Sequence, residues 1–245
     1  MTRLSVNLNK IALLRNSRGR DYPSVAEFAR RFIDLGVDGI TVHPRQDERH
    51  TRRRDVYDLA RVCESFANVE FNIEGYPSED FLAMVGEVGP DQCTLVPDAV
   101  DQITSDHGWD VEASKAVLVP VLERLRNDGV RSSLFVDPVP GQVSAAARIG
   151  ADRIELYTES YAVGYHGPDR AGALAAYRKA ADAAHAAGIG VNAGHDLDLD
   201  NLAEFLGIGG ILEVSIGHAL TVECIEHGME NVIRRYLRIC HETGT

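Results

Sequence analysis

Short apolar runs recur along the chain, separated by stretches in which apolar residues follow a helical spacing. Each run has the length and β-branched content of a buried strand, and each ends in polar residues. The pattern predicts eight strands, at Leu4–Leu8, Gly39–His43, Val69–Ile73, Gln92–Leu95, Arg131–Phe135, Arg153–Leu156, Gly190–Ala193 and Leu212–Ile216. A helix-like segment follows each strand.

Helix boundaries are also marked in the sequence. Ser24 and Glu27 have the spacing of a capping box, and Val111–Asp128 and Ala171–Ala187 are helical in composition. The capping box opens a helix with an apolar stripe, formed by Val25, Phe28, Phe32 and Leu35. Glycines that can end a helix in the left-handed conformation lie before several strands, at Gly36, Gly129, Gly150, Gly188 and Gly209.

Strands that alternate with helices indicate right-handed βαβ units and a parallel sheet, the α/β class. Eight such units within 245 residues favour a closed (β/α)8 TIM barrel with extra short helices, since such barrels need roughly 250 residues. The alternative, an open dinucleotide-binding sheet, lacks the G-x-G-x-x-G turn after the first strand. No linker or change of composition divides the chain, so residues 1–245 are expected to form one domain.

Composition narrows the classes of partner. Hydrophobic residues make up 44% of the chain and charged residues 25%, which is typical of a folded globular protein. The net charge of −12 disfavours binding to nucleic acid and to anionic membranes. The chain start resembles no signal peptide, and the four cysteines form no C-x-x-C pair. A cytoplasmic protein with reduced thiols is expected.

Reactive side chains gather where the predicted strands end, which is where barrel enzymes carry their active sites. They are Asn7, Asn9, Lys10, His43, Arg45, His50, Glu74, Glu155, His195 and His218. Four of the nine histidines share this rim, whereas a single histidine would more often be structural. The remaining histidines lie in helices or loops and receive no role: His107, His166, His185, His227 and His241.

Phosphate binding is indicated by glycines in the loops after strands seven and eight, within Asn192–Asp196 and Ser215–His218. Arg18, in the loop after strand one, could add a charged donor. The cationic segment His43–Arg54 could instead be a solvated surface loop. We expect Arg45 and His50 to reach the pocket and Arg52–Arg54 to be surface or interface residues. Without H-x-H or H-E-x-x-H spacing, acid/base chemistry is favoured over a metal site.

Several of these segments together resemble the pyridoxine 5′-phosphate synthase family, over almost the whole chain. The matching segments are Val6–Asn9, Leu14–Gly19, Asp38–His50, Asn72–Glu74, Leu95–Pro97, Val191–His195 and Ile216–His218. The segment from His43 to His50 is the most specific of them. The resemblance implies a cytosolic, octameric transferase of vitamin B6 biosynthesis that needs no cofactor and no metal. Its substrates would be 3-amino-2-oxopropyl phosphate and 1-deoxy-D-xylulose 5-phosphate, and its products pyridoxine 5′-phosphate, phosphate and water.

Residue roles follow from the same resemblance. His43 and Glu74 would be general bases and His195 the general acid, while Glu155 would stabilise the transition state. The amino-ketone phosphate would be held by Asn7, Arg18, Gly217, His218 and the backbone of Asp196. The deoxyxylulose phosphate would be held by Asn9, Lys10, Arg45, His50 and Thr104.

The chain departs from the better-known family pattern at two places. It has Asn9-Lys10 where Asp-His is usual, and Asp196 where glycine is usual after the strand-seven histidine. Lys10 keeps a positive charge for a sugar phosphate, whereas Asp196 could serve an anion only through its backbone N–H. The stretch Thr94–Gly108 is expected to be a lid over the pocket.

Two other functions compete with this interpretation. The first is another sugar-phosphate barrel enzyme, an aldolase or isomerase; a Schiff-base aldolase would need a lysine in the barrel, and only Lys10 is suitably placed. The second is a barrel that binds phosphorylated metabolites without catalysis, because fold alone does not imply chemistry.

Overall fold

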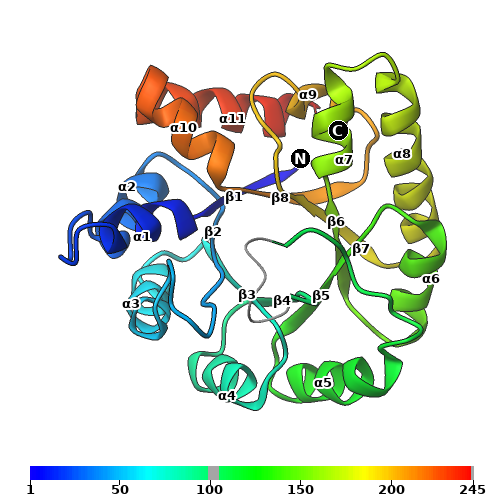
Figure 1. Ribbon diagram of the computed structural model, residues 1–245, viewed down its shortest axis with the longest axis horizontal. Coiled ribbons are helices and arrows are strands. Elements are labelled where there is room, and N and C mark those ends of the chain that lie inside the picture. Colours follow the sequence, from blue (N-terminus) through cyan, green and yellow to red (C-terminus); the bar gives the residue numbers. More distant parts are fainter. Residues whose placement is uncertain (99–104, 244–245) are drawn as a thin grey trace.

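The eight predicted strands form a closed barrel in the computed structural model, which describes residues 1–98 and 105–243. Every strand is parallel to its neighbours, and β8 closes the ring against β1 (Figure 1). The strands are β1 (Arg3–Asn7), β2 (Gly39–Val42), β3 (Glu70–Gly75), β4 (Gln92–Leu95), β5 (Arg131–Val136), β6 (Arg153–Tyr157), β7 (Gly190–Gly194) and β8 (Ile211–Ile216). The predicted barrel is confirmed, and the predicted strand ends agree with these bounds to within two residues.

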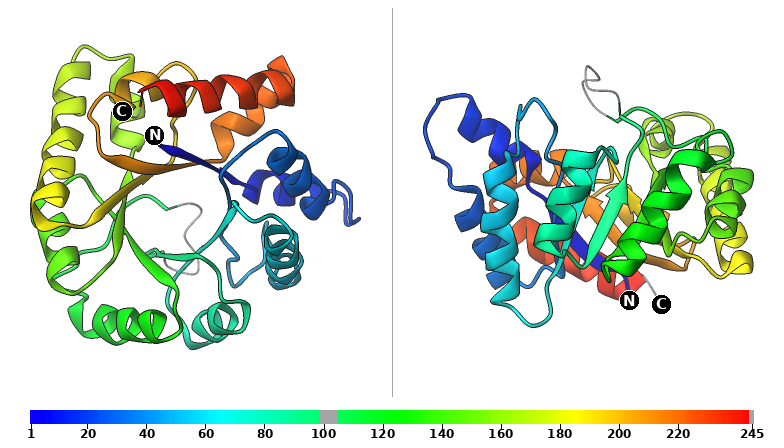
Figure 2. Two further views of the ribbon diagram at one scale, coloured as in Figure 1. Left: turned by 180° about the vertical axis from the view of Figure 1, so that it is seen from behind. Right: turned by 90° about the horizontal axis from the view of Figure 1, so that it is seen from below.

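Helices lie outside the ring of strands, as the left view of Figure 2 shows. They are α1 (Asn9–Asn16), α2 (Val25–Asp34), α3 (Arg53–Glu64), α4 (Glu79–Val88), α5 (Lys115–Asn127), α6 (Pro140–Arg148), α7 (Glu159–Tyr165), α8 (Arg170–Ala187), α9 (Leu202–Leu206), α10 (His218–His227) and α11 (Met229–Thr243). Among the residues that the structure describes, no helix combines the length and apolar character needed to cross a membrane.

Local signals explain most helix ends. The Ser24 hydroxyl accepts a hydrogen bond from the Glu27 backbone N–H at 3.2 Å, as the capping pattern predicts, while the Glu27 carboxylate pairs with Arg30. The five glycines predicted to end helices all have positive φ, between 69° and 97°. The helix predicted from Val111 begins later, at Lys115, because Val111 lies in a turn where its N–H donates to the Gln142 side chain.

The main apolar core lies between the strands and the helices, whereas the inside of the barrel is polar. Alternate residues point outward into the core, such as Ile40 and Ile73, both fully buried. Side chains that are connected by hydrogen bonds inside the ring are Ser5, Thr41, Asn72, Thr94, Gln92, Asn192 and Glu213. Branched apolar residues usually fill this space. Here the polar layers form the floor beneath the carboxyl ends of the strands.

Candidate active site

A cavity of about 450 Å³ opens at the carboxyl ends of the strands. Parallel strands all end at the same rim, so side chains that are far apart in sequence meet there. The cavity is lined by Asn7, Asn9, Lys10, Arg45, His50, Glu74, Ser105, Glu155, Tyr157, Glu159, His195, Asp196, Ser215, Gly217 and His218. Most of the predicted site residues are therefore brought together in one place.

Two of the predicted residues, His43 and Arg18, do not line the large cavity. His43 is buried beside the cavity; its ring centroid lies 6.2 Å from that of His50, and it lines a smaller adjoining cavity of about 50 Å³. Arg18 does not reach the large cavity and is exposed. The sequence predicts a loop directly after strand one, but α1 occupies that stretch and carries the chain away from the rim for about 12 Å. Thr104 lies outside the described residues, as does part of the predicted lid.

The cavity floor holds two carboxyl groups whose surroundings disfavour their ionised form. Burial, reinforced by the charges of Asp98 and Glu213, raises the pKa of Glu74 to about 8. Burial and the neighbouring Glu74 raise the pKa of Glu155 well above its ordinary value. One Glu155 oxygen is buried with no hydrogen-bond partner among the described residues. Glu74 can therefore hold a proton near neutral pH and exchange it with a ligand.

The pKa values of three histidines, His43, His50 and His195, are shifted in the opposite direction. Burial, with help from Lys10 and Arg45, lowers the pKa of His195 to about 4. Burial and the charge of Arg45 also lower the pKa of His50 to about 4, and that of His43 well below its usual value. Each of these three rings is therefore neutral at pH 7 and can both donate and accept a hydrogen bond.

His195 occupies a strained turn immediately after β7. It and Asp196 have φ of 75° and 55°, which are left-handed values that non-glycine residues seldom adopt. Thr158 Oγ1 donates to the carbonyls of Gly194 and His195, and Asn201 Nδ2 donates to the Asp196 carbonyl at 3.1 Å. These contacts hold the turn, and the imidazole packs 5.0 Å from the ring centroid of Phe135.

Gly194 is required beside Glu155. A Cβ atom built on Gly194 would collide with the Glu155 carboxylate, so any larger residue would displace that carboxylate from the cavity floor. The packing role of this glycine is to leave room for the Glu155 carboxyl group. The phosphate contact predicted for its loop stays a prediction.

One end of the cavity lies between β8 and the start of α10. Gly217 is the N-cap of α10 and His218 is its first residue, so the free backbone N–H groups of the helix start lie at the rim. Asn7 packs beside Gly217, where an added Cβ would lie 3.1 Å from the Asn7 Cβ. Together these residues place hydrogen-bond donors and the positive end of a helix dipole at the rim, an arrangement that suits an anion.

Asn9 connects three segments of the site. Its side-chain oxygen accepts hydrogen bonds from the His43 backbone N–H and from Thr51 Oγ1, both at 2.9 Å. Its own backbone N–H donates to Asn7 Oδ1 at 3.0 Å. An aspartate could accept the same two bonds, which explains physically how Asn and Asp can both serve at this position.

Replacing Asn9 with Leu is therefore expected to lower the free energy of unfolding by ~1–3 kcal/mol, because the His43 N–H would lose its acceptor. Asn9→Asp retains an accepting oxygen and should cost clearly less. Urea denaturation of both variants and the parent measures the difference. Equal losses in the two variants would contradict the role of the oxygen.

Some cavity residues were not found from the sequence. Tyr157 and Glu159 line the wall, and the Tyr157 hydroxyl donates to Glu159 at 2.6 Å. Tyr157 follows Glu155 by two residues in β6, so strand alternation could have placed both on the inner face. Asp98, which pairs with Arg45 and accepts from Ser105 at 2.7 Å, follows a strand end without any distinctive motif.

Sequence comparisons agree with this geometry. The family profile described as pyridoxal phosphate biosynthesis protein PdxJ matches residues 4–242. A pyridoxine 5′-phosphate synthase of Cytophaga hutchinsonii is 49% identical over 239 residues, which cover 97% of this chain and 98% of the relative. The synthase of Mesorhizobium japonicum is 51% identical over 243 residues, with coverage of 97% and 98%. That of Porphyromonas gingivalis is 50% identical over 237 residues, covering 96% and 98%.

Superposition on solved structures supports the fold and nothing further. The tryptophan synthase A-subunit of Pyrococcus furiosus superimposes with a TM-score of 0.66 at 14% identity, covering 97% of this chain and 96% of that one. A structure described as native KDPGal superimposes with a TM-score of 0.60 at 14% identity, with coverage of 98% and 95%. The family match over nearly the whole length and the relatives of about half-identical sequence settle the assignment: this chain belongs to the PdxJ family of pyridoxal phosphate biosynthesis proteins.

Proposed function

We propose that the protein condenses 3-amino-2-oxopropyl phosphate with 1-deoxy-D-xylulose 5-phosphate, forming pyridoxine 5′-phosphate, phosphate and water. The observation that carries this proposal is the meeting of Glu74, Glu155 and His195 in one cavity that is also lined by Lys10, Arg45 and the start of α10. The relatives named pyridoxine 5′-phosphate synthase support the same reaction. Amine attack on a ketone, loss of water and phosphate, and ring closure all require proton transfers that such groups perform.

In this proposal Glu74 and His43 remove protons and His195 supplies one. Glu155 accepts hydrogen bonds from cationic or N–H groups that develop during imine formation, and its unpartnered oxygen is available for this. Glu74 is held in place by Asn7, whose Nδ2 donates to it at 3.3 Å. Orientation by such contacts lowers the entropic barrier of a reaction between two bound substrates.

The two phosphate groups would bind at different parts of the cavity. Lys10, Arg45 and His50 supply donors for the deoxyxylulose phosphate, and Asn9 positions the backbone beneath them. Asn7, Gly217, His218 and the backbone N–H of Asp196 would hold the amino-ketone phosphate at the start of α10. Contact of Thr104 with the sugar phosphate remains a prediction from the resemblance.

A direct assay tests the reaction. Purified protein is incubated with both substrates, and pyridoxine 5′-phosphate and released phosphate are measured together. Equal amounts of the two products are expected, and none when either substrate is omitted. Cleavage or isomerisation of deoxyxylulose phosphate alone would instead support the aldolase or isomerase alternative, in which Lys10 is the cavity lysine. Binding without any turnover would support the non-catalytic alternative.

The family assignment also supports an assembly proposal. We propose a cytoplasmic homo-octamer built from copies of a single-domain chain, with small phosphorylated metabolites as its ligands. Sedimentation velocity on the purified protein tests the assembly. A monomer at micromolar concentration would contradict the octamer without affecting the assignment of the reaction.

Asp196→Asn is expected to lower the KM for the amino-ketone phosphate by about 2- to 5-fold. The Asp196 carboxylate faces the cavity beside Glu159, and burial together with this neighbour raises its pKa. Removing its negative charge reduces repulsion of the phosphate, and asparagine tolerates the left-handed φ of 55°. Steady-state kinetics measure the change, with Asp200→Asn in the same loop as control. An unchanged or higher KM would show that the carboxylate does not oppose phosphate binding.

A further inference from the structure

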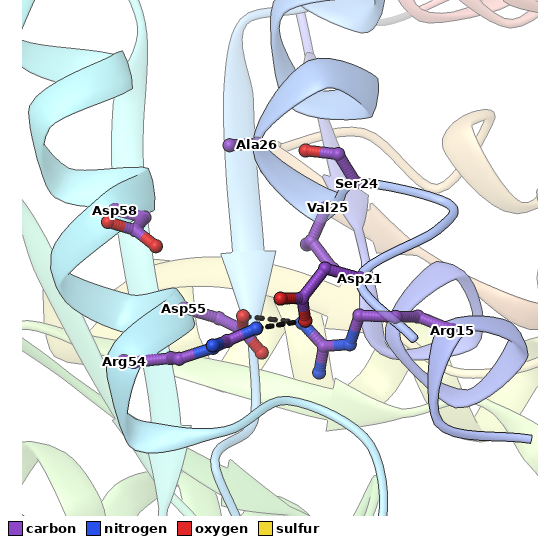
Figure 3. Close-up of a pocket in the computed structure, with 8 residues that line it drawn as sticks. All are labelled: Arg15, Asp21, Ser24, Val25, Ala26, Arg54, Asp55 and Asp58. Atoms are coloured by element: carbon purple, nitrogen blue, oxygen red, sulfur yellow. Dashed lines mark hydrogen bonds and ion pairs between the residues drawn. The ribbon is translucent and has the colours of Figure 1, made fainter. Parts of the chain in front are cut away.

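A buried ion pair lies outside the cavity, at the carboxyl end of α1. The Arg15 side chain is 2% exposed, and its guanidinium lies 2.5 Å from the carboxylate of Asp55 in α3. Figure 3 shows these two side chains pointing toward each other, beside the exposed pair formed by Arg54 and Asp21. Burial of two charges has a desolvation cost that a pair of apolar residues would avoid. The other contacts of Arg15 therefore indicate why this charge is buried despite that cost.

Arg15 and Asn16 together hold one backbone segment of the loop after β2. Arg15 donates to the His50 carbonyl at 3.1 Å. The Asn16 side-chain amide lies within hydrogen-bond distance of three successive carbonyls, those of residues 48, 49 and 50, at 3.2, 3.0 and 2.8 Å. Arg15 Nε also donates to Asn16 Oδ1 at 3.1 Å, which orients that amide.

The two residues that follow this segment, Thr51 and Arg52, are also held by hydrogen bonds. The second Asp55 oxygen accepts from the Arg52 backbone N–H at 2.7 Å, and Thr51 Oγ1 donates to Asn9. The Thr51 backbone N–H donates to His50 Nδ1 at 2.9 Å. Because Nδ1 is an acceptor in this bond, a neutral His50 ring must carry its proton on Nε2.

We propose that Arg15, Asn16 and Asp55 form a positioning clamp that holds His50 in its Nε2–H tautomer at the cavity wall. The clamp holds the His50 carbonyl and so fixes the peptide whose N–H selects the tautomer. The ring then presents an N–H donor to the ligand rather than a lone pair. An anionic ligand group accepts only from the donor form, so the clamp determines the affinity of this part of the cavity.

The part of this inference that concerns affinity rests on the proposed function, because it assigns His50 to the deoxyxylulose phosphate. The part that concerns the tautomer does not. A purely structural role for the ion pair would change stability alone. The clamp would change the state of one imidazole and the KM for one substrate, so the two explanations can be distinguished.

Asn16→Ala is the main test, because Asn16 is half-exposed and its removal leaves no buried charge unpaired. Arg15→Lys is the second variant, since lysine keeps the charge but has no planar fork to contact Asp55 and a carbonyl together. Arg54→Ala is the matched control, because it removes the neighbouring ion pair with Asp21, which does not involve residues 48–50.

The first measurement is ¹⁵N NMR of the histidine side chains in the ligand-free protein, with His50 assigned by a His50→Gln variant. The parent and Arg54→Ala should show His50 as the Nε2–H tautomer, and Asn16→Ala should show a mixture. This measurement gives a result whether or not the protein makes pyridoxine 5′-phosphate. An unchanged tautomer in both clamp variants would overturn the proposal.

The second measurement is steady-state kinetics with each substrate varied. Asn16→Ala should raise the KM for deoxyxylulose phosphate by about 5- to 30-fold, while kcat and the KM for the amino ketone change by less than about 2-fold. Equal changes in both KM values, or a loss of stability with unchanged kinetics, would overturn the clamp. A parent protein without turnover would refute the proposed function and leave the tautomer test valid.

Discussion

Glu74→Gln is expected to lower kcat on the order of 10²- to 10⁴-fold, the contribution of a positioned general base. Glutamine keeps the size of the side chain and can still contact Asn7, but it cannot take a proton. Glu74 is 4% exposed and faces the cavity from the end of β3, where both substrates would meet. Product formation under saturating substrates measures the effect.

Glu213→Gln is the matched control for this substitution. Glu213 is another buried glutamate inside the barrel whose pKa burial raises, but it does not line the cavity. Its replacement should lower stability, through altered contacts with Gln92 and Arg153, while kcat stays within a few-fold of the parent. A kcat for Glu74→Gln near that of the parent would remove Glu74 from the proton-transfer steps.

The pH dependence of catalysis and of stability follows from the carboxyl group of Glu74. Its pKa of about 8 exceeds the ordinary value of 4.5, so only the deprotonated fraction acts as a base, and kcat/KM should rise with pH up to about 8. The stability of the fold is expected to change with pH in the opposite direction to kcat/KM. Between those two pH values the folded protein holds a proton that the unfolded chain releases, so stability falls as pH rises through this interval. Thermal melts should show a smaller fall for Glu74→Gln than for the parent.

His195→Asn is expected to produce the second large loss, also on the order of 10²- to 10⁴-fold in kcat, because asparagine can donate a hydrogen bond but cannot transfer a proton. Burial and the nearby cations Lys10 and Arg45 lower the pKa of His195 and keep its ring neutral. A bound phosphate adds negative charge beside it, which should raise its pKa and prepare it to act as an acid.

Two measurements examine this role. Kinetics compare His195→Asn with His185→Asn, a substitution of an exposed histidine in α8 that should leave kcat unchanged. An NMR titration of His195 with and without inorganic phosphate should show an upward shift of its pKa from about 4. A residual kcat close to that of the parent, or a phosphate-bound pKa no higher than the free value, would contradict the general-acid role.

The repeated alternation of strand and helix was sufficient to predict the barrel, because each unit needs a neighbour to bury its apolar face. It also predicted the common rim, since parallel strands must all end on one side. Glu74, Glu155 and His195 could therefore be placed together before any contact was known. The position of Arg18 could not be predicted in this way, because the length of α1 determines where the following loop lies. No residue marks the start of α1 in the sequence, since the N-cap of this helix is Leu8 and no side chain caps it.

Other properties of the site depend on the tertiary structure alone. A sequence lists carboxyl groups and imidazoles, but their pKa values depend on burial and on neighbours such as Asp98, which belong to other segments. The same holds for the His50 tautomer, which depends on a clamp between α1 and α3. The sequence by itself thus determined the barrel and the rim that carries the chemistry, since both follow from local periodicity. Distances between segments decided which groups hold protons, because electrostatic and hydrogen-bond energies depend on separation in space.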